Sequence, residues 1–243
     1  MEKAAKTIIL GGLSFLLAAP LSAQDKAEAA VGGDLVSSYI WRGQDLGGVS
    51  IQPSASVSWK GLSLTAWGSV GFDRDDTKEL DWTLGYACKG FSVSVTDYWF
   101  DKSTNFKTGL DLGRNYFHYG SAETSHVWEA QIGYDFGFMA LNWYTNIGGN
   151  DGRKDNGDRA YSSYFSISAP FTWAGVDWKA EVGATPWATS FYNGGAGGFE
   201  VSSVSLKAEK SIPLTEKFSL PLSVQASCNP ATEDFYIVLG LHL

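Results

Sequence analysis

The chain has 243 residues, of which 44% are hydrophobic, 14% aromatic and only 18% charged, and it contains 28 glycines. This length suffices for one large domain or a sizeable barrel, and the composition is too apolar and aromatic for a disordered chain. The net charge of −8 argues against a nucleic-acid partner, because binding to phosphates requires a basic surface.

The first 23 residues have the features of a secretory signal peptide. Lys3 and Lys6 give a positive start, a short apolar run follows, and Ala23 is a small residue of the kind that precedes a cleavage site. The apolar run is too short for a membrane anchor, since a spanning helix needs about 20 apolar residues. We therefore expect residues 1–23 to be removed and residues 24–243 to form a single exported domain.

The rest of the chain is a series of segments in which apolar and polar residues alternate. In Ile51–Trp59, apolar residues occupy every second position, and Gln or Ser the positions between. A period of two is typical of a β-strand with one apolar face, and no run of 18 apolar residues predicts a membrane helix. The expected strands are Val31–Trp41, Ile51–Trp59, Leu62–Phe72, Leu80–Cys88, Phe91–Phe100, His126–Phe136, Met139–Ile147, Tyr161–Ala169, Val176–Ala184, Phe199–Lys210, Leu220–Cys228 and Phe235–Leu243.

The connections between these segments alternate in length. Short turns such as Lys60-Gly61 and Lys89-Gly90 alternate with longer segments such as 42–50 and 101–123. An even number of strands of about ten residues, with short turns at one end and longer loops at the other, is the pattern of bacterial outer-membrane barrels. The predicted fold is all-β: a transmembrane antiparallel up-and-down β-barrel of about 12 strands, with short periplasmic turns and longer extracellular loops.

The alternation alone also fits a soluble barrel or sandwich with an apolar interior. Two features favour the membrane: about twelve strands enclose more space than side chains fill, and aromatic residues gather near strand ends, as at a bilayer interface. These residues are Trp41, Phe72, Trp82, Trp99 and Trp128 toward the long loops, and Trp59, Tyr86, Phe91, Tyr134, Phe136 and Trp178 toward the short turns. We therefore expect the apolar faces to contact lipid and the polar faces to line the lumen.

Several short motifs resemble those of the TorF-type porins, an outer-membrane family of about this length. They are Ser-Ser-Tyr-Ile-Trp-Arg-Gly at 37–43 with the loop 44–50, the strand 61–72 with Trp-Gly-Ser at 67–69, Glu-Leu-Asp-Trp at 79–82, and Ala-Tyr-Ser-Ser-Tyr at 160–164. The resemblance implies a barrel in the outer membrane of the Gram-negative cell envelope. Its motifs mark barrel architecture and do not identify a substrate.

The polar faces define the side chains expected to line the lumen. Acidic residues at these positions exceed basic ones, which in a confined pore would favour cations or neutral polar solutes over anions. Inward tyrosines either fill space or stack on a ring-shaped solute. The expected pore-lining residues are Asp34, Arg42, Asp81, Glu129, Asp135, Lys179, Glu181, Lys207, Tyr98, Tyr144 and Tyr164.

The longest connection, 101–123, is the expected constriction of the pore. It carries the aromatic residues Phe106, Tyr116, Phe117 and Tyr119. A loop of more than about 15 residues is usually functional or disordered, so we expect these side chains to narrow the lumen.

No pattern predicts catalysis or a cofactor. Of the three histidines, His118 lies near Ser121 in the longest loop, but the spacing identifies no orienting partner for it. His126 falls on a lipid-facing position, and His242 lies at the end of the last strand. The segment 150–158 is rich in Asp, Asn and Gly but lacks the glutamate that closes an EF-hand loop, so it reads as a turn without a bound metal. We expect a protein without enzymatic activity or cofactor.

The pattern as a whole favours an outer-membrane channel for passive diffusion of small polar or cationic solutes. The alternative is a non-conducting barrel whose surface loops bind a partner, and an outer-membrane enzyme is less favoured. The expected partners are outer-membrane lipid, an unidentified small polar solute and the barrel-assembly machinery.

The two faces also predict opposite responses to substitution. Arginine in the middle of a lipid-facing row should destabilise the barrel, whereas arginine at the neighbouring inward positions should be tolerated. The expected sensitive positions are Val57, Ala66, Val93 and Val182, and the expected tolerant ones are Ser56, Thr65, Ser94 and Gly183.

Overall fold

The structure, a computed structural model, describes residues 26–120, 123–215 and 218–243, and the predicted signal peptide lies outside them. Within these ranges, no helix is long and apolar enough to cross a membrane. The strands are β1 (Glu28–Val36), β2 (Tyr39–Trp41), β3 (Gln44–Gly47), β4 (Ser50–Trp59), β5 (Leu62–Gly71), β6 (Glu79–Cys88), β7 (Phe91–Phe100), β8 (His126–Asp135), β9 (Ala140–Gly149), β10 (Ser163–Trp173), β11 (Val176–Thr185), β12 (Glu200–Pro213), β13 (Ser219–Asn229) and β14 (Asp234–His242).

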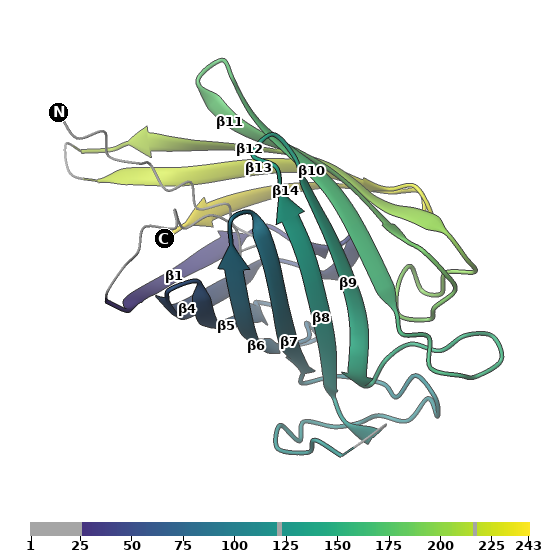
Figure 1. Cartoon of the computed structure of the whole chain (residues 1–243). Coiled ribbons are helices and arrows are strands. Elements are labelled where there is room, and N and C mark those ends of the chain that lie inside the picture. The colour runs from purple at the N-terminus through teal and green to yellow at the C-terminus, as the bar shows by residue number, and fades with distance from the viewer. Residues whose placement is uncertain (1–25, 121–122, 216–217) are drawn as a thin grey trace.

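Twelve of these strands, β1 and β4 to β14, form one closed barrel. Each of β4 to β13 pairs antiparallel with the next strand in the chain, and β1 closes the barrel between β14 and β4. In Figure 1 the long connections gather at the lower right, while the short turns and the C-terminus lie at the other end of the strands. The prediction of an all-β up-and-down barrel is confirmed.

The turns at the short-loop end follow from local sequence. Lys60 and Gly61 have φ angles of 50° and 88°, and Lys89 and Gly90 have φ angles of 51° and 85°. Two consecutive residues with positive φ make a turn whose twist matches that of the flanking strands, and glycine adopts the second position without strain. The Xaa-Gly pairs therefore fix the register of the strands that they join.

Two strand boundaries differ most from the expectation. The first strand ends at Val36 and not at Trp41, and the residues after it leave the barrel wall to form the separate β2–β3 hairpin. Pro170 lies within β10, which continues to Trp173. Because β9 pairs with β10 only as far as Ser168, Pro170 lies at a free edge of the sheet, where proline is accepted.

The seam between the first and last strands is short. β1 pairs with β4 along its whole length, from Glu28 to Val36. Its ladder with β14 runs only from Asp34 to Val36, with Asp34 opposite His242. The barrel is therefore closed by a much shorter ladder than the ones that join its other strands.

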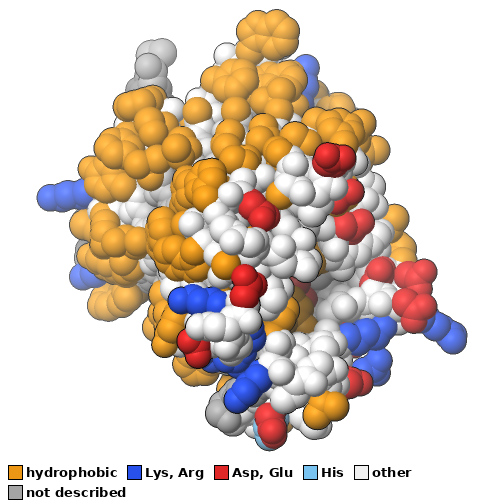
Figure 2. Space-filling model, turned by 90° about the vertical axis from the view of Figure 1, so that its right-hand side faces the viewer, with side chains coloured by type: hydrophobic (Ala, Val, Ile, Leu, Met, Phe, Trp, Pro, Cys, Tyr) orange, Lys and Arg blue, Asp and Glu red, His pale blue; other side chains and the backbone are white. Residues whose placement is uncertain are grey.

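The distribution of side chains is the reverse of that in a soluble barrel. Outward residues include Phe72, Leu84 and Ile237, with exposed fractions of 65%, 60% and 61%, whereas most of the buried side chains are polar. In Figure 2, hydrophobic side chains cover the upper and left parts of the face shown, and charged ones gather lower and to the right. A barrel with an apolar outside and a polar inside satisfies its surroundings only in lipid.

The aromatic residues at the strand ends mostly follow the prediction. Trp59, Tyr86, Phe91, Tyr134 and Phe136 are exposed near the short turns, and Phe72, Trp82 and Trp128 near the long loops. The placement of Trp41 among them was wrong, because the β2–β3 hairpin carries this side chain into the lumen.

A closed barrel predicts heat-modifiable migration. Because each wall strand is paired on both sides, detergent at room temperature should leave the barrel intact, and boiling should unfold it. We expect an unboiled sample to migrate differently from a boiled one on a denaturing detergent gel. Identical migration of the two samples, together with recovery in the soluble fraction, would contradict the membrane barrel.

Candidate functional site

A short hairpin crosses the inside of the barrel near its long-loop end. β2 and β3 pair with each other, and the turn between them is Arg42-Gly43, with φ angles of 51° and 81°. This is the same Xaa-Gly geometry as in the turns of the barrel wall. A Cβ on Gly43 would collide with the backbone carbonyl of Ser202 in β12, so only glycine allows the hairpin tip to approach the opposite wall this closely.

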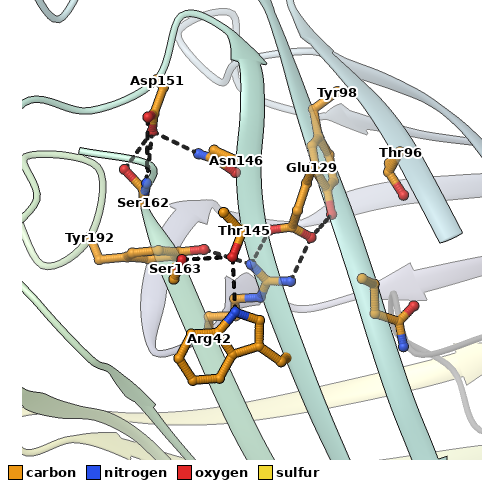
Figure 3. Close-up of polar contacts among 12 residues, drawn as sticks. Arg42, Thr96, Tyr98, Glu129, Thr145, Asn146, Asp151, Ser162, Ser163 and Tyr192 are labelled. Carbon is orange, nitrogen blue, oxygen red and sulfur yellow. Dashed lines mark hydrogen bonds and ion pairs between the residues drawn. The ribbon is translucent and has the colours of Figure 1, made fainter. Parts of the chain in front are cut away.

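Arg42 forms the central ion pair of the lumen (Figure 3). Its two terminal nitrogens donate to both carboxylate oxygens of Glu129 in β8, at 2.5 Å and 2.9 Å. Tyr98 donates its hydroxyl to Glu129 at 2.9 Å, and Arg42 also donates to the hydroxyl of Tyr192 at 2.6 Å. The side chains of Arg42 and Glu129 are 9% and 2% exposed, so both charges are withdrawn from water and depend on each other.

The protonation of this group follows from its surroundings. Burial acts to lower the pKa of Arg42, but the carboxylate of Glu129 outweighs it and raises the pKa well above the ordinary value. Burial also raises the pKa of the Tyr192 hydroxyl, which therefore stays neutral. The guanidinium is thus permanently charged at any physiological pH.

Aromatic rings enclose the guanidinium of Arg42. Its central carbon lies 4.0 Å from the ring centre of Tyr144, 4.4 Å from that of Trp41 and 4.8 Å from that of Tyr164. Trp41 in turn stacks on Tyr192, with ring centres 5.9 Å apart. Contacts between a desolvated cation and aromatic faces are each worth up to about 2 kcal/mol, so the rings add to the ion pair in holding the hairpin.

Two loops are folded inward beside this site. The carboxylate of Asp151 accepts hydrogen bonds from the hydroxyl of Ser162 at 2.5 Å and from the amide of Asn146 at 3.2 Å (Figure 3). Ser162 is also 2.6 Å from the hydroxyl of Thr189, in the loop that carries Tyr192. All four side chains are almost fully buried, so this network positions Tyr192 against Arg42.

The loop that carries Tyr192 is also bonded directly to the hairpin and the wall. Asn193 donates its backbone N–H to the side-chain oxygen of Gln44 in β3, at 3.1 Å. Asn229 of β13 donates to the carbonyl of Gly43 at 3.0 Å and to the side chain of Asn193 at 2.9 Å. The hairpin tip is therefore held from the wall and from one of the long loops.

The predicted pore-lining residues do not form a single site. Arg42, Tyr98, Glu129, Tyr144 and Tyr164 come together in the cluster just described. Four of the other charged members lie in separate pairs along the wall. They are Lys179 with Glu181 at 2.8 Å, Lys207 with Glu209 at 2.6 Å, and Asp34 with His242 at 2.7 Å.

Two predicted pore-lining acids have other surroundings. Asp135 ends β8 at the short-turn end, where its carboxylate accepts the backbone N–H of Gly137 at 2.7 Å. Asp81 is only 2% exposed, between Trp67 and Tyr98 on the neighbouring strands, and no lysine or arginine of the described residues pairs with it. It interacts electrostatically with the nearby Glu79.

The residues of the predicted constriction are divided between two places. Phe106 contacts Phe191, the neighbour of Tyr192, with ring centres 5.7 Å apart, and so reaches the edge of the hairpin site. Tyr116 and Tyr119 instead cover His126, and Phe117 is 88% exposed. Narrowing by the segment 101–123 stays a prediction, whereas the side chains that reach across the lumen belong to the β2–β3 hairpin.

The outer rim holds a hydrogen-bonded histidine–aspartate pair beneath this segment. His126 lies 2.8 Å from Asp97 through Nδ1 and 2.6 Å from the carbonyl of Tyr116 through Nε2. Tyr119 stacks on the histidine ring at 4.2 Å. The pair lies on the outward rows of β7 and β8, so the loop shields two polar side chains that would otherwise face the membrane interface.

Two important features were not predicted. Tyr192 lies in an irregular loop with no periodic pattern, and nothing in the sequence links it to Arg42. The inward hairpin had a local signal, because Arg42-Gly43 repeats the Lys60-Gly61 type of turn. Across the described ranges, no three His, Cys, Asp or Glu side chains gather closely enough to hold a metal ion.

Comparisons with known proteins give structural neighbours only. No family model matches the chain, and no curated protein matches it in sequence. Among solved structures, an outer membrane channel from Pseudomonas putida F1 is 13% identical, with a TM-score of 0.43, covering 93% of this chain and 97% of that one. OmpF of Salmonella typhi, in a complex with daunomycin, is 10% identical, with a TM-score of 0.38, covering 88% and 96%.

Proposed function

We propose that this protein is a channel of the bacterial outer membrane through which small polar or cationic solutes diffuse. The observation that carries the proposal is the polar interior of a closed barrel whose outside is apolar. Exposed aromatic residues near both ends of the strands fit the two interfaces of a bilayer. The TorF-type porins, whose motifs the chain resembles, remain its proposed family.

The charges of the lumen support cationic over anionic solutes. Glu129, Glu181 and Glu209 are each paired with a basic side chain. In contrast, no lysine or arginine of the described residues lies within ion-pair distance of Glu79 or Asp81, which are 7% and 2% exposed. Two buried carboxyl groups this close together share a proton, so we expect the pair to carry about one negative charge that no base offsets, and such a charge inside a narrow tube raises the local concentration of cations.

The β2–β3 hairpin crosses the lumen and so favours a resting state in which the channel is closed. It also supports a second candidate function, that of a non-conducting barrel. It reaches from the β1–β4 side of the barrel to Glu129 in β8 and Ser202 in β12. A hairpin that never leaves this position would make the protein a non-conducting barrel, with its extracellular loops as the functional surface. Conduction requires the hairpin to move or solutes to pass beside it.

Planar-bilayer recording tests the proposal. We expect purified protein to give discrete current steps and a cation-selective reversal potential in a salt gradient. The double variant Glu79→Gln/Asp81→Asn should move that potential toward zero, because it removes the negative charge of this pair, which no base offsets. Asp158→Asn, in an exposed loop, is the matched control and should leave the potential unchanged.

Two results would contradict these expectations. The absence of current from folded protein over a wide voltage range would refute the channel and favour the non-conducting barrel. A reversal potential that is the same in the wild type and in Glu79→Gln/Asp81→Asn would refute the role of the two acids while leaving the channel intact.

A further inference from the structure

Three side chains at the seam of the barrel form a continuous hydrogen-bonded chain. Nδ1 of His242 in β14 lies 2.7 Å from the carboxylate of Asp34 in β1, and its Nε2 lies 3.0 Å from the hydroxyl of Ser223 in β13. The sequence predicted no orienting partner for His242. Its partners come from strands far away in the chain that only barrel closure brings together.

The register of the three strands creates this arrangement. Asp34 lies directly opposite His242, and Ser223 lies opposite Gly240, two residues before His242 on the same face of β14. A Cβ on Gly240 would collide with the Ser223 hydroxyl and would lie 3.4 Å from Nε2 of His242. The missing side chain of Gly240 therefore leaves the space through which the imidazole reaches the serine.

The three residues face the interior of the barrel. Ser223 is 7% exposed, whereas its neighbour Val224, on the opposite face of β13, is 48% exposed. The side chains of His242 and Asp34 are 13% and 18% exposed, so they are shielded but not sealed. Ser223 lies near the beginning of β13 and His242 ends β14, which places the group toward the short-turn end of the lumen, away from the hairpin.

The hydrogen bonds of His242 with Asp34 and Ser223 allow the histidine to take the hydroxyl proton of the serine, as a nucleophilic serine requires. When Nδ1 donates to Asp34, the Nε2 lone pair is free to accept the proton of the Ser223 hydroxyl. A serine, a histidine that accepts its proton and a carboxylate that orients the histidine form the constellation of serine hydrolases, which is recognised by geometry and not by fold or chain order. Both distances are within hydrogen-bonding range without a bound substrate.

We propose that Ser223 is a nucleophile that cleaves activated carboxylic esters small enough to enter the lumen, with His242 as the general base and Asp34 as a positioning residue. The proposal does not depend on ion conduction, because the group lies in the wall of the barrel whether the hairpin is seated or released.

The reaction balances with water as the only co-reactant. The Ser223 oxygen forms a bond to the ester carbonyl carbon while its proton moves to Nε2 of His242. The carbon–oxygen bond to the leaving group then breaks, and the same proton passes from Nε2 to the departing oxygen. Water attacks the acyl-serine with His242 again as the base, which releases the carboxylic acid and restores the Ser223 hydroxyl.

The class of ester follows from the surroundings of Ser223. Its backbone is paired on both sides, with Glu209 in β12 and Gly240 in β14, so the ladder engages the main-chain groups that often hold an oxyanion. An aryl ester, whose leaving group departs readily, needs less stabilisation of that charge. The charged groups that face this site are Asp34, opposite His242, and Glu209, which lies opposite Ser223 on β12 and is paired with Lys207.

A fluorophosphonate probe tests the nucleophile directly on the purified, folded full-length barrel. Attack by Ser223 forms a phosphorus–oxygen bond and releases fluoride, and mass spectrometry of the digested protein locates the adduct. We expect labelling of Ser223 but not of Ser227, which lies on the same face of β13 and is 2% exposed, but is not bonded to a histidine. Ser223→Ala should abolish both labelling and hydrolysis of p-nitrophenyl acetate.

The roles of the other two residues are tested by rate and by pH. His242→Gln should lower the labelling rate about 100-fold or more, the contribution of a general base. Asp34→Asn should lower the rate and also displace its pH profile, which a residue that only holds the seam together would not do. Heat-modifiable migration shows in each case that the variant is still folded.

Three results would contradict the proposal that Ser223 is a nucleophile. Absence of adduct on Ser223 in folded wild-type protein, or equal labelling of Ser223 and Ser227, would overturn the proposal and leave the three residues as a structural tie across the seam. A rate in folded His242→Gln equal to that of the wild type would likewise overturn it. None of these results bears on the conductance measurements, so the two proposals fail independently.

Discussion

Replacing Arg42 with alanine should release the β2–β3 hairpin and open the lumen. The substitution leaves Glu129, which is 2% exposed, as a buried charge without its partner, at a cost of about 3 to 5 kcal/mol. This energetic cost is removed if the hairpin moves out of the lumen, because water then reaches the carboxylate of Glu129. A shift of that size changes the ratio of released to seated hairpins by about 100-fold or more, since each 1.4 kcal/mol is tenfold.

Single-channel recording measures this shift as a rise in the open fraction or in the conductance. Adding Glu129→Gln to Arg42→Ala should partly reverse it, because the neutral side chain no longer leaves a buried charge unpaired. Phe117→Ala, in the exposed part of the segment 101–123, serves as the control and should behave like the wild type. If Phe117→Ala opens the pore and Arg42→Ala does not, the constriction lies in the long loop and not in the hairpin.

Arginine on the outward face of the wall should destabilise the barrel much more than arginine on the inward face. Val57 and Val182 are exposed on the apolar face, at 44% and 46%, so a charge there must enter the hydrocarbon region. We expect Val57→Arg and Val182→Arg each to lower the free energy of unfolding by about 2 to 4 kcal/mol. The measurement is urea-induced unfolding in lipid vesicles.

The controls are the inward neighbours Ser56→Arg and Thr65→Arg, which should lose much less stability. Ser56 and Thr65 lie directly opposite each other on β4 and β5, so both test the same level of the lumen. Equal losses at the outward and inward positions would mean that the assignment of the two faces is incorrect.

Most of the barrel wall was predictable because its determinants are local. The alternation in Ile51–Trp59 fixes which face of β4 is apolar, and the Lys60-Gly61 turn fixes where β5 begins. Any strand with one lipid-facing side has apolar residues at every second position. The strands could therefore be predicted without knowing which of them pair.

The interior was predictable only in part, because its contacts are non-local. Glu129 was expected to line the pore, but its partner Arg42 is 87 positions away in the chain. The two side chains are in contact only because the hairpin folds into the lumen. The expected tolerance of Gly183 to arginine was wrong for the same reason. A Cβ there would collide with the hydroxyl of Tyr164, which is 2% exposed and packs against that glycine from β10.

The short ladder between β1 and β14 has a consequence for how the barrel assembles. The ladders from β4 to β14 join strands that are consecutive in the chain, so they can form one after another with small losses of chain entropy. Closure must instead bring together Asp34 and His242, which are 208 positions apart, for only a few main-chain bonds. Closure should therefore be the last and slowest step, and until it occurs the unpaired edges of β1 and β14 are exposed to other chains.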